Sequence, residues 1–274
     1  MQCSMSGSNN KVFAQSLACL GKVGKEVVIN ASKSIGNMTL STFNDAKTAF
    51  VEFTFDHDFF EKFAIDGPNE CSVVVKVPLK SLLSSFKNIR NVDRMTVSIH
   101  QTGVNHLLQF KSMCKGGMGK TYTISFEDSA IQQATFKDSD SFNRVVARTS
   151  LLNKALDHIY GEEAAISLLD SNGIRIKSHY QYVDKNMEYE TLKTDMAISL
   201  EDLDDLRFLG LTEIAFAVRE MKALLQFCDA NEILSCSITF GDAGEPFRLS
   251  SEGTDESFFR TKLIMATLRA EEIQ

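Results

Sequence analysis

The sequence predicts an α+β protein built from two repeated domains, each with two helices packed on antiparallel sheets. Three observations predict this fold. Helix and strand patterns follow one another in the same order in both halves, hairpin signals join most strands, and matched elements keep an offset near 140 residues, as from Lys11 to Ser150 and from Cys71 to Thr212. A fixed offset of this size indicates a duplicated unit, in which two helices must share one sheet face to bury their apolar stripes.

The first half begins with an amphipathic helix at residues 11–23, whose apolar face carries Phe13, Leu17 and Leu20. Residues 79–89 predict a second helix, and residues 56–63 a short helical piece. The other apolar runs alternate with period two and predict strands at 26–43 (a pair with a turn at 35–37), 49–55, 71–77, 94–100, 106–113 and 120–126.

The second half repeats this order. Helices are expected at residues 150–161 and 219–230, and a short helical piece at 201–208. Strands are expected at 163–180 (a pair), 193–200, 212–218, 234–240, 246–251 and 257–268. We therefore expect an N-terminal domain over residues 1–126, a polar interdomain connector over 127–143 and a C-terminal domain over 144–274.

Composition excludes several classes of protein. With 274 residues and 43% hydrophobic residues, the chain can form a large core, and no apolar run reaches the length of a membrane helix. The first ten residues lack the basic and apolar segments of a secretory signal. Because none of the six cysteines forms a C-x-x-C pair, we expect reduced, buried thiols and neither structural zinc nor a disulfide framework.

The net charge of −7 is unevenly distributed. Residues 1–137 have a net charge of +4, whereas residues 138–274 have a net charge of −11. A protein that binds nucleic acid with its whole surface would be basic throughout, so this chain could only use a local basic face.

The stretch GGMGKT, residues 116–121, matches the end of a phosphate-binding loop. Cys114 stands where the first glycine of that motif belongs, and the residues that follow alternate as a strand does, whereas the motif requires a helix. The sequence therefore predicts a basic β-hairpin here, with no helix N-terminus to bind a nucleotide phosphate.

Each predicted helix places basic residues opposite its apolar stripe, interspersed with Ser and Gln. These residues are Lys11, Lys22, Lys80, Lys87, Lys154, Arg219 and Lys222. Each face alone is typical of a solvated helix, but its recurrence on four helices of an acidic protein favours a surface that contacts phosphates without reading sequence.

The order and spacing of these segments resemble a known family over essentially the whole chain. Residues 1–63, 79–86, 114–128 and 213–252 resemble the Rad-nine subunit of the nine-one-one DNA damage checkpoint clamp, a PCNA-like sliding clamp. The resemblance implies a non-enzymatic, nuclear protein without cofactor or metal, one of three different subunits in a ring that encircles double-stranded DNA. A clamp loader would place the ring at damage sites, where it recruits a checkpoint activator and repair enzymes.

The resemblance also assigns roles to residues of this chain. The seven basic residues above would face the DNA inside the ring, and partner peptides would dock in a pocket under the connector formed by Phe43, Ile131 and Phe136, for which ordinary packing is the alternative. Subunits would join through edge strands, for which residues 71–77 and 121–126 are candidates. The family's phosphorylated C-terminal tail has no counterpart up to Gln274, so signalling through a tail is not assigned to these residues.

Two alternatives remain open. A homotrimeric replication clamp of the PCNA type shares the fold and the DNA chemistry. A metal-dependent nuclease would need clustered carboxylates, and the acidic stretch Glu201, Asp202, Asp204 and Asp205 is instead typical of a solvated helix start. The five histidines are scattered, and none lies at a recognisable spacing from a nucleophile.

Overall fold

The computed structural model describes residues 1–86, 89–102, 105–137, 142–169, 172–179, 192–251 and 258–269. The chain divides into two compact units, the first made of residues 1–133 and 254–261 and the second of residues 134–253 and 262–274. The predicted domain boundaries at residues 126 and 143 remain a prediction.

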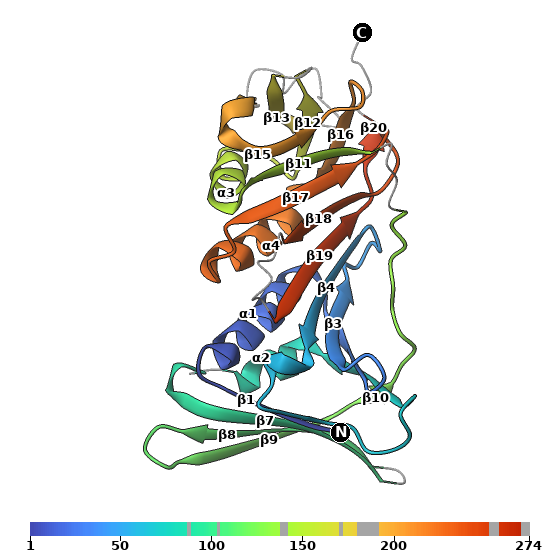
Figure 1. Ribbon diagram of the computed structural model, residues 1–274, viewed down its shortest axis with the longest axis vertical. Coiled ribbons are helices and arrows are strands. Elements are labelled where there is room, and N and C mark those ends of the chain that lie inside the picture. Colours follow the sequence, from blue (N-terminus) through green and yellow to red (C-terminus); the bar gives the residue numbers. More distant parts are fainter. Residues whose placement is uncertain are drawn as a thin grey trace. The chain divides into compact units, whose positions relative to one another are not determined.

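The first unit contains two helices and the strands around them (Figure 1). In chain order its elements are β1 (Gln2–Ser6), α1 (Gly7–Val23), β2 (Glu26–Ser32), β3 (Asn37–Phe43), β4 (Ala49–Asp56), η1 (His57–Phe59), β5 (Lys62–Ala64), β6 (Ser72–Pro78), α2 (Leu79–Ser85), η2 (Ile89–Asn91), β7 (Val92–Thr102), β8 (Asn105–Cys114), β9 (Gly119–Ser125) and β10 (Glu127–Asp128). One run of strands has the order β5-β1-β7-β8-β9 and the other the order β10-β6-β2-β3-β4, with antiparallel pairing.

The second unit repeats this order of helices and strands, without a described counterpart of η2. Its elements are β11 (Asn143–Arg148), α3 (Thr149–Asp157), β12 (Glu163–Leu168), β13 (Gly173–His179), β14 (Asp195–Ser199), η3 (Leu200–Asp202), β15 (Leu203–Arg207), β16 (Glu213–Ala217), α4 (Val218–Ala230), β17 (Ser235–Phe240), β18 (Phe247–Ser251), β19 (Phe259–Met265) and β20 (Leu268–Arg269). The strand orders are β15-β11-β17-β18-β19 and β14-β13-β12-β16-β20. Residues 259–261 of β19 count with the first unit.

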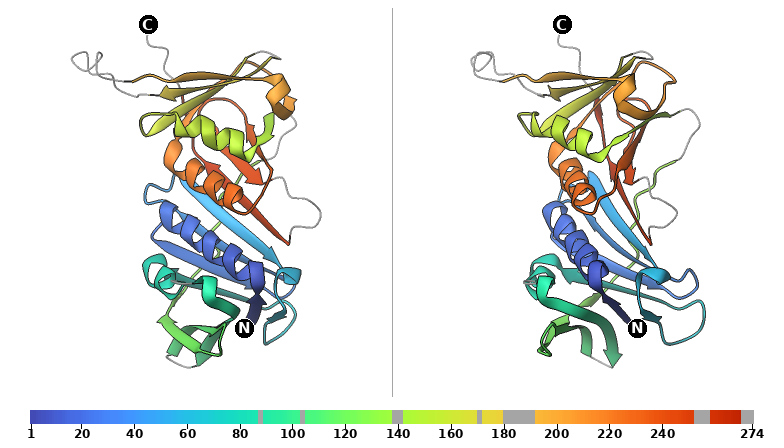
Figure 2. Two further views of the ribbon diagram at one scale, coloured as in Figure 1. Left: turned by 90° about the vertical axis from the view of Figure 1, so that its left-hand side faces the viewer. Right: turned by 60° about the vertical axis from the view of Figure 1, so that its left-hand side comes forward.

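The two helices of each unit lie beside one another on the sheets (Figure 2). Helix α1 buries Phe13, Leu17 and Leu20, as its 3.6-residue period predicts. It ends before Gly24, where a Cβ atom would lie 2.1 Å from the hydroxyl of Thr42 and 2.5 Å from the carbonyl of Phe43. Only glycine allows the backbone of α1 and β3 to approach so closely.

The hairpin prediction for residues 114–128 is confirmed. Strands β8 and β9 pair from Leu107 opposite Ser125 to Met113 opposite Gly119, and no helix follows the glycine-rich turn. The GGMGKT stretch therefore lacks the strand-loop-helix geometry of a nucleotide site.

The two short helical predictions were wrong over most of their length. Residues 56–63 form a single turn of 3-10 helix and then β5, and residues 201–208 form the turn η3 and then β15. Strand β5 pairs with β1, and β15 pairs with β11, so ladder hydrogen bonds to distant segments override the local helix signals.

The cysteines described by the structure are free, and five of the six are buried. Burial raises the pKa of the Cys3 thiol to about 12 and that of the Cys19 thiol to about 12, because the apolar core disfavours the thiolate. Among the described helices, none is long and apolar enough to span a membrane.

Candidate nucleic-acid interface

The exposed face of α1 and α2 carries three of the predicted cations. Lys11 and Lys22 lie at opposite ends of α1, and Lys80 lies in the first turn of α2; all three are exposed. Lys11 and Lys22 are separated by three helical turns on the face opposite Phe13 and Leu17. The fourth cation predicted for this face, Lys87, lies outside the described residues.

Two of these lysines have no acidic partner among the described residues and are therefore available to bind an external anion. In the part of the chain that the structure describes, no ion pair involves Lys11 or Lys80. The first turn of α2 contains no acidic residue. An ammonium group without an acidic neighbour keeps its full charge for an external anion, so this face could bind phosphates.

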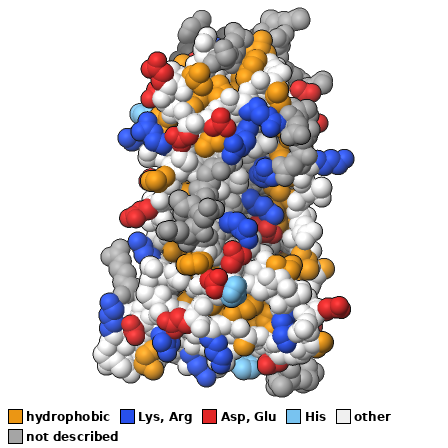
Figure 3. All heavy atoms as spheres, viewed as in Figure 1, with side chains coloured by type: hydrophobic (Ala, Val, Ile, Leu, Met, Phe, Trp, Pro, Cys, Tyr) orange, Lys and Arg blue, Asp and Glu red, His pale blue; other side chains and the backbone are white. Residues whose placement is uncertain are grey.

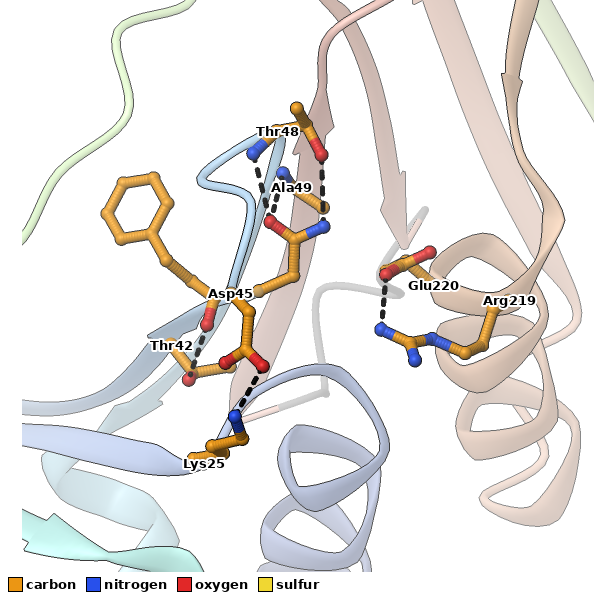
Figure 4. A network of polar contacts seen from close by, with 9 residues as sticks. Lys25, Thr42, Asp45, Thr48, Ala49, Arg219 and Glu220 are labelled. Atoms are coloured by element: carbon orange, nitrogen blue, oxygen red, sulfur yellow. Dashed lines mark hydrogen bonds and ion pairs between the residues drawn. The ribbon is translucent and has the colours of Figure 1, made fainter. Parts of the chain in front are cut away.

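The second unit pairs most of its predicted cations internally. Arg219 donates to Glu220 at 2.8 Å, and Lys222 lies 2.6 Å from Asp157 (Figure 4 draws the first pair). The side chain of Glu220 is only 4% exposed, and a buried carboxylate requires a charged or hydrogen-bonding partner. Lys154 is exposed on α3 and takes part in no ion pair among the described residues.

Phe43, at the end of β3, lies in the first unit beside a hydrogen-bonded turn. Its ring lies 4.8 Å from that of Phe50, with the ammonium group of Lys47 5.3 Å from its centroid. The buried amide of Asn44 closes the turn: its oxygen accepts from the amides of Thr48 and Ala49 at 2.9 and 3.0 Å (Figure 4). Phe43 is therefore half buried, at the start of a turn that the Asn44 side chain closes.

The other two residues of the predicted peptide pocket lie on the chain that links the units. Ile131 is 49% exposed and counts with the first unit. Phe136 counts with the second unit, where the guanidinium group of Arg248 lies 4.7 Å from its ring and Phe142 lies 5.6 Å away. Phe43 and Phe136 thus each have a packing partner within their own unit, and a pocket shared by the three residues remains a prediction.

The acidic stretch of residues 201–205 is held by hydrogen bonds and ion pairs. Asp205 pairs with Arg144 at 3.1 Å, Asp204 accepts from the hydroxyl of Ser235 at 2.5 Å, and Asp202 accepts from Ser199 at 3.0 Å. Within the described ranges, no group of three or more His, Cys, Asp or Glu side chains could hold a metal ion. These carboxylates therefore make hydrogen bonds and ion pairs within and beside the β11–β15 strand pair.

Two features were predicted as elements but not as parts of a site. One is β14, which lies within the predicted strand 193–200 but whose place at the outer edge of its sheet was not predicted; Asp195, Ala197 and Ser199 are exposed there and Ile198 is buried. The other is the β8–β9 hairpin, which was predicted as basic but whose lysines, Lys111, Lys115 and Lys120, were not assigned to a site, although residues 95–126 contain no Asp or Glu. On the face drawn in Figure 3, by contrast, basic and acidic side chains are interspersed.

Comparison with known proteins gives one family and one fold. The model of the Rad9 family matches residues 13–268. A Drosophila melanogaster cell cycle checkpoint control protein, Rad9, is 25% identical over 275 residues, covering 100% of this chain and 58% of the fly protein. The Schizosaccharomyces pombe DNA repair protein rad9 is 22% identical, covering 98% of this chain and 70% of the yeast protein. The chain thus spans little more than half of the fly relative.

Solved structures of sliding clamps share the fold. The PCNA2–PCNA3 complex of Sulfolobus tokodaii aligns with a TM-score of 0.74 at 13% identity, covering 97% of this chain and 99% of the other. The PCNA of Thermococcus kodakaraensis aligns with a TM-score of 0.74 at 14% identity over the same shares. The PCNA-like clamp fold expected from the sequence is confirmed.

Proposed function

The chain belongs to the Rad9 family, and on that premise we propose that it is a non-enzymatic subunit of a heterotrimeric ring clamp. The ring would encircle double-stranded DNA at damage sites in the nucleus and recruit checkpoint signalling and repair proteins. The observation that carries the proposal is the family match across residues 13–268 on a sliding-clamp fold.

DNA would pass along the exposed helix faces. Lys11, Lys22 and Lys80 in the first unit, and Lys154, Arg219 and Lys222 in the second, are the described cations proposed to contact phosphates; Lys87 completes the proposed set. Phosphate contacts carry no sequence information, which suits a ring that must slide along any DNA.

The other subunits would attach by extending its sheets. Strands β9 and β14 are each the outermost strand of their sheet. An outer strand presents unpaired backbone groups that a neighbouring chain can pair with, as in β-augmentation. Strand β6 is a weaker candidate, because β10 already covers it at Val75 and Lys76.

Recruitment would use short peptides. Phe43, Ile131 and Phe136 are proposed to receive them, with a clamp loader, a checkpoint activator and repair enzymes as the partners. Replacing Ile131 by Glu should weaken capture of such peptides while leaving ring assembly intact, because the side chain is half exposed and its loss removes little packing.

Solution mass by light scattering tests the proposal. We expect the chain alone to be a monomer and to form a one-to-one-to-one complex when it is co-expressed with two other clamp subunits. A stable trimer of the chain alone would instead favour the homotrimeric replication clamp. A Mg²⁺-dependent nuclease activity that disappears in Asp204→Asn/Asp205→Asn would contradict a non-enzymatic role.

A further inference from the structure

The β12–β13 hairpin turns at Asn172 and Gly173, the one Asn-Gly pair in the sequence. Gly173 has a φ of +139°, and a Cβ atom added to it would clash with the carbonyl oxygen of Ile198 in β14. Asn172 does not have a positive φ, so the pair does not form the type I′ turn in which Asn-Gly usually occurs. The turn thus requires its glycine but not its asparagine.

Two groups of this pair can react with one another. The carbonyl of Leu169 accepts from the amide of Asn172 at 2.8 Å rather than from that of Gly173, so the nitrogen of Gly173 is not tied across the hairpin. The side chain of Asn172 is exposed, and its amide makes no hydrogen bond with a described residue. Because glycine has no side chain, its nitrogen can approach the side-chain carbon of the asparagine before it.

The asparagines of two other turns lack this combination. Asn44 is buried, and its side-chain oxygen accepts from two backbone amides. Asn37 begins the matching strand of the first unit, but there the turn glycine, Gly36, comes before the asparagine and Met38 follows it. A side chain on the following residue hinders attack by its nitrogen. Of the three, only Asn172 has both an exposed side chain and a glycine after it.

We propose that Asn172 is a site of spontaneous deamidation, with water as the only co-reactant. The nitrogen of Gly173 bonds to Cγ of Asn172 and the Cγ–Nδ2 bond breaks, so that ammonia leaves with the amide proton of Gly173. Water then opens the cyclic imide without any oxidation or reduction. Attack at Cγ gives aspartate, and attack at the former main-chain carbonyl gives isoaspartate, in which the main chain runs through Cγ and gains one methylene group.

The isoaspartate product does not fit beside β14. The amide of Leu200 donates to the main-chain carbonyl of Asn172 at 2.9 Å, and in the product this carbonyl becomes a free carboxylate off the main chain. Gly173 pairs with Ser199 and has no room towards Ile198, so an added methylene group disturbs this pairing. The reaction therefore weakens the attachment of the end of β14, a strand proposed to meet a neighbouring subunit.

Mass spectrometry of the aged chain tests the reaction, which needs no partner and is independent of the proposed function. The tryptic peptide 155–175 has Asn172 as its one asparagine, and the peptide 34–47 carries Asn37 and Asn44 as internal controls. During storage at neutral pH and physiological temperature, the first peptide should gain the mass difference between an acid and an amide several-fold faster than the second. Retention of Asn172 in the folded chain, while the urea-unfolded chain converts it, would overturn the inference.

Amide hydrogen exchange at Leu200 measures the effect on β14. Exchange should be faster in the aged chain than in the fresh chain. Aged Asn172→Gln should match the fresh chain, because its longer side chain closes the imide ring far more slowly. Fresh Asn172→Asp should match it too, because this variant adds the charge and keeps the main chain. Faster exchange in aged Asn172→Gln, or none in the aged unmodified chain, would refute the weakened attachment of β14.

Assembly of the ring separates this inference from the proposed function. The fresh chain should assemble with two other clamp subunits, and the aged chain should lose affinity for the subunit that β14 meets, whereas aged Asn172→Gln should keep it. Equal affinity of the aged and fresh chains, with Asn172 converted, would refute the effect on assembly. If the fresh chain forms no ring, the proposed function fails, and the mass and exchange measurements still decide the deamidation site.

Discussion

The two units share their helices and strands in the same order, with η2 as the one element of the first unit that has no described counterpart, yet they fill their cores differently. The first unit packs a cluster of phenylalanines in which Phe55 contacts Phe13, Phe59, Phe60 and Phe259 at ring distances of 4.6 to 6.4 Å. The second unit uses mainly aliphatic side chains, with Phe216 and Phe247 as an aromatic pair 5.1 Å apart. The fold therefore depends on where apolar residues occur and on total volume, more than on which apolar residue is used.

The units also differ in which strands are protected. Strand β4 of the first unit is buried along most of its length, and its end at Asp56 is covered by Phe258 and Arg260. Its counterpart β14 is an outer strand with largely exposed residues. Conversely, β9 is exposed at every second residue, whereas its counterpart β19 is mostly buried. Each unit thus leaves a different strand, β9 or β14, at the outer edge of a sheet. A ring subunit would then join its two neighbours through two unlike ends.

The largest effect should come from matched core positions. Strand registers make Phe55, opposite Met38, equivalent to Ile198, opposite Ile174. Phe55→Ala should lower the free energy of unfolding by about 3–5 kcal/mol, and Ile198→Ala by about 2 kcal/mol, because Ile198 lies on an outer strand. Urea unfolding followed by circular dichroism measures both. Equal losses would mean that the aromatic cluster adds nothing beyond its volume.

The open edges predict a selective loss of partners. Thr123→Lys on β9 and Ala197→Lys on β14 replace exposed residues with a charge that discourages strand pairing. Each variant should lose one clamp subunit and keep the other, with affinity for the lost subunit reduced about 100-fold, which is about 2.7 kcal/mol. Pull-down of each subunit measures this, with Thr123→Ser as the control. Loss of the same subunit in both variants would contradict two unlike ends.

Much of this comparison could be predicted from the sequence. The four helices, the β8–β9 hairpin and the duplication follow from local periodicity, which needs no knowledge of distant residues. Strands β1 and β11 were not assigned as separate strands, because Gln2–Ser6 and Asn143–Arg148 have few apolar residues or border a polar connector. They form through pairing with segments 58 (Ser4 with Lys62) to 97 (Asn143 with Phe240) residues away, such as β7 with β1.

The candidate site was less accessible to sequence reasoning. Helical periodicity placed Lys11, Lys80 and Lys154 on exposed faces, where the structure has them. It could not show that Lys222 pairs with Asp157 across α3 and α4, because that contact joins residues 65 positions apart. Nor could it show that Phe136 packs against Arg248. Periodicity gives the face of a side chain, whereas its partners depend on the tertiary fold.

Differential pairing of the helix cations predicts unequal contributions to DNA binding. Lys11→Gln/Lys80→Gln should reduce the salt slope of ring binding by about 2, because neither lysine has an acidic partner among the described residues. Arg219→Gln/Lys222→Gln should reduce it by less than 1, because both cations already face a carboxylate. Fluorescence anisotropy with a labelled duplex measures both slopes. Equal reductions would show that the internal ion pairs open on DNA.

The buried thiols of the first unit predict the smallest effect, and its sign follows from linkage. Cys19 lies in the core with its pKa raised from 9.0 to about 12, so between these values the unfolded chain loses a proton that the folded chain keeps. Stability from this group is fully present below pH 9 and is lost as the pH rises towards 12. At pH 10 the loss relative to pH 7 should be about 1.4 kcal/mol.

Comparing pH profiles isolates this thiol from the other groups that titrate at alkaline pH. Cys19→Ala should remove about 1.4 kcal/mol of the loss in unfolding free energy between pH 7 and pH 10, and adding Cys3→Ala should remove a similar amount again, since the pKa of Cys3 is also raised to about 12. Any constant cost of the smaller side chains shifts the whole profile and leaves its slope unaffected. Parallel profiles for the variants and the unmodified chain would mean that water reaches these thiols in the folded state, which would contradict the burial of Cys3 and Cys19.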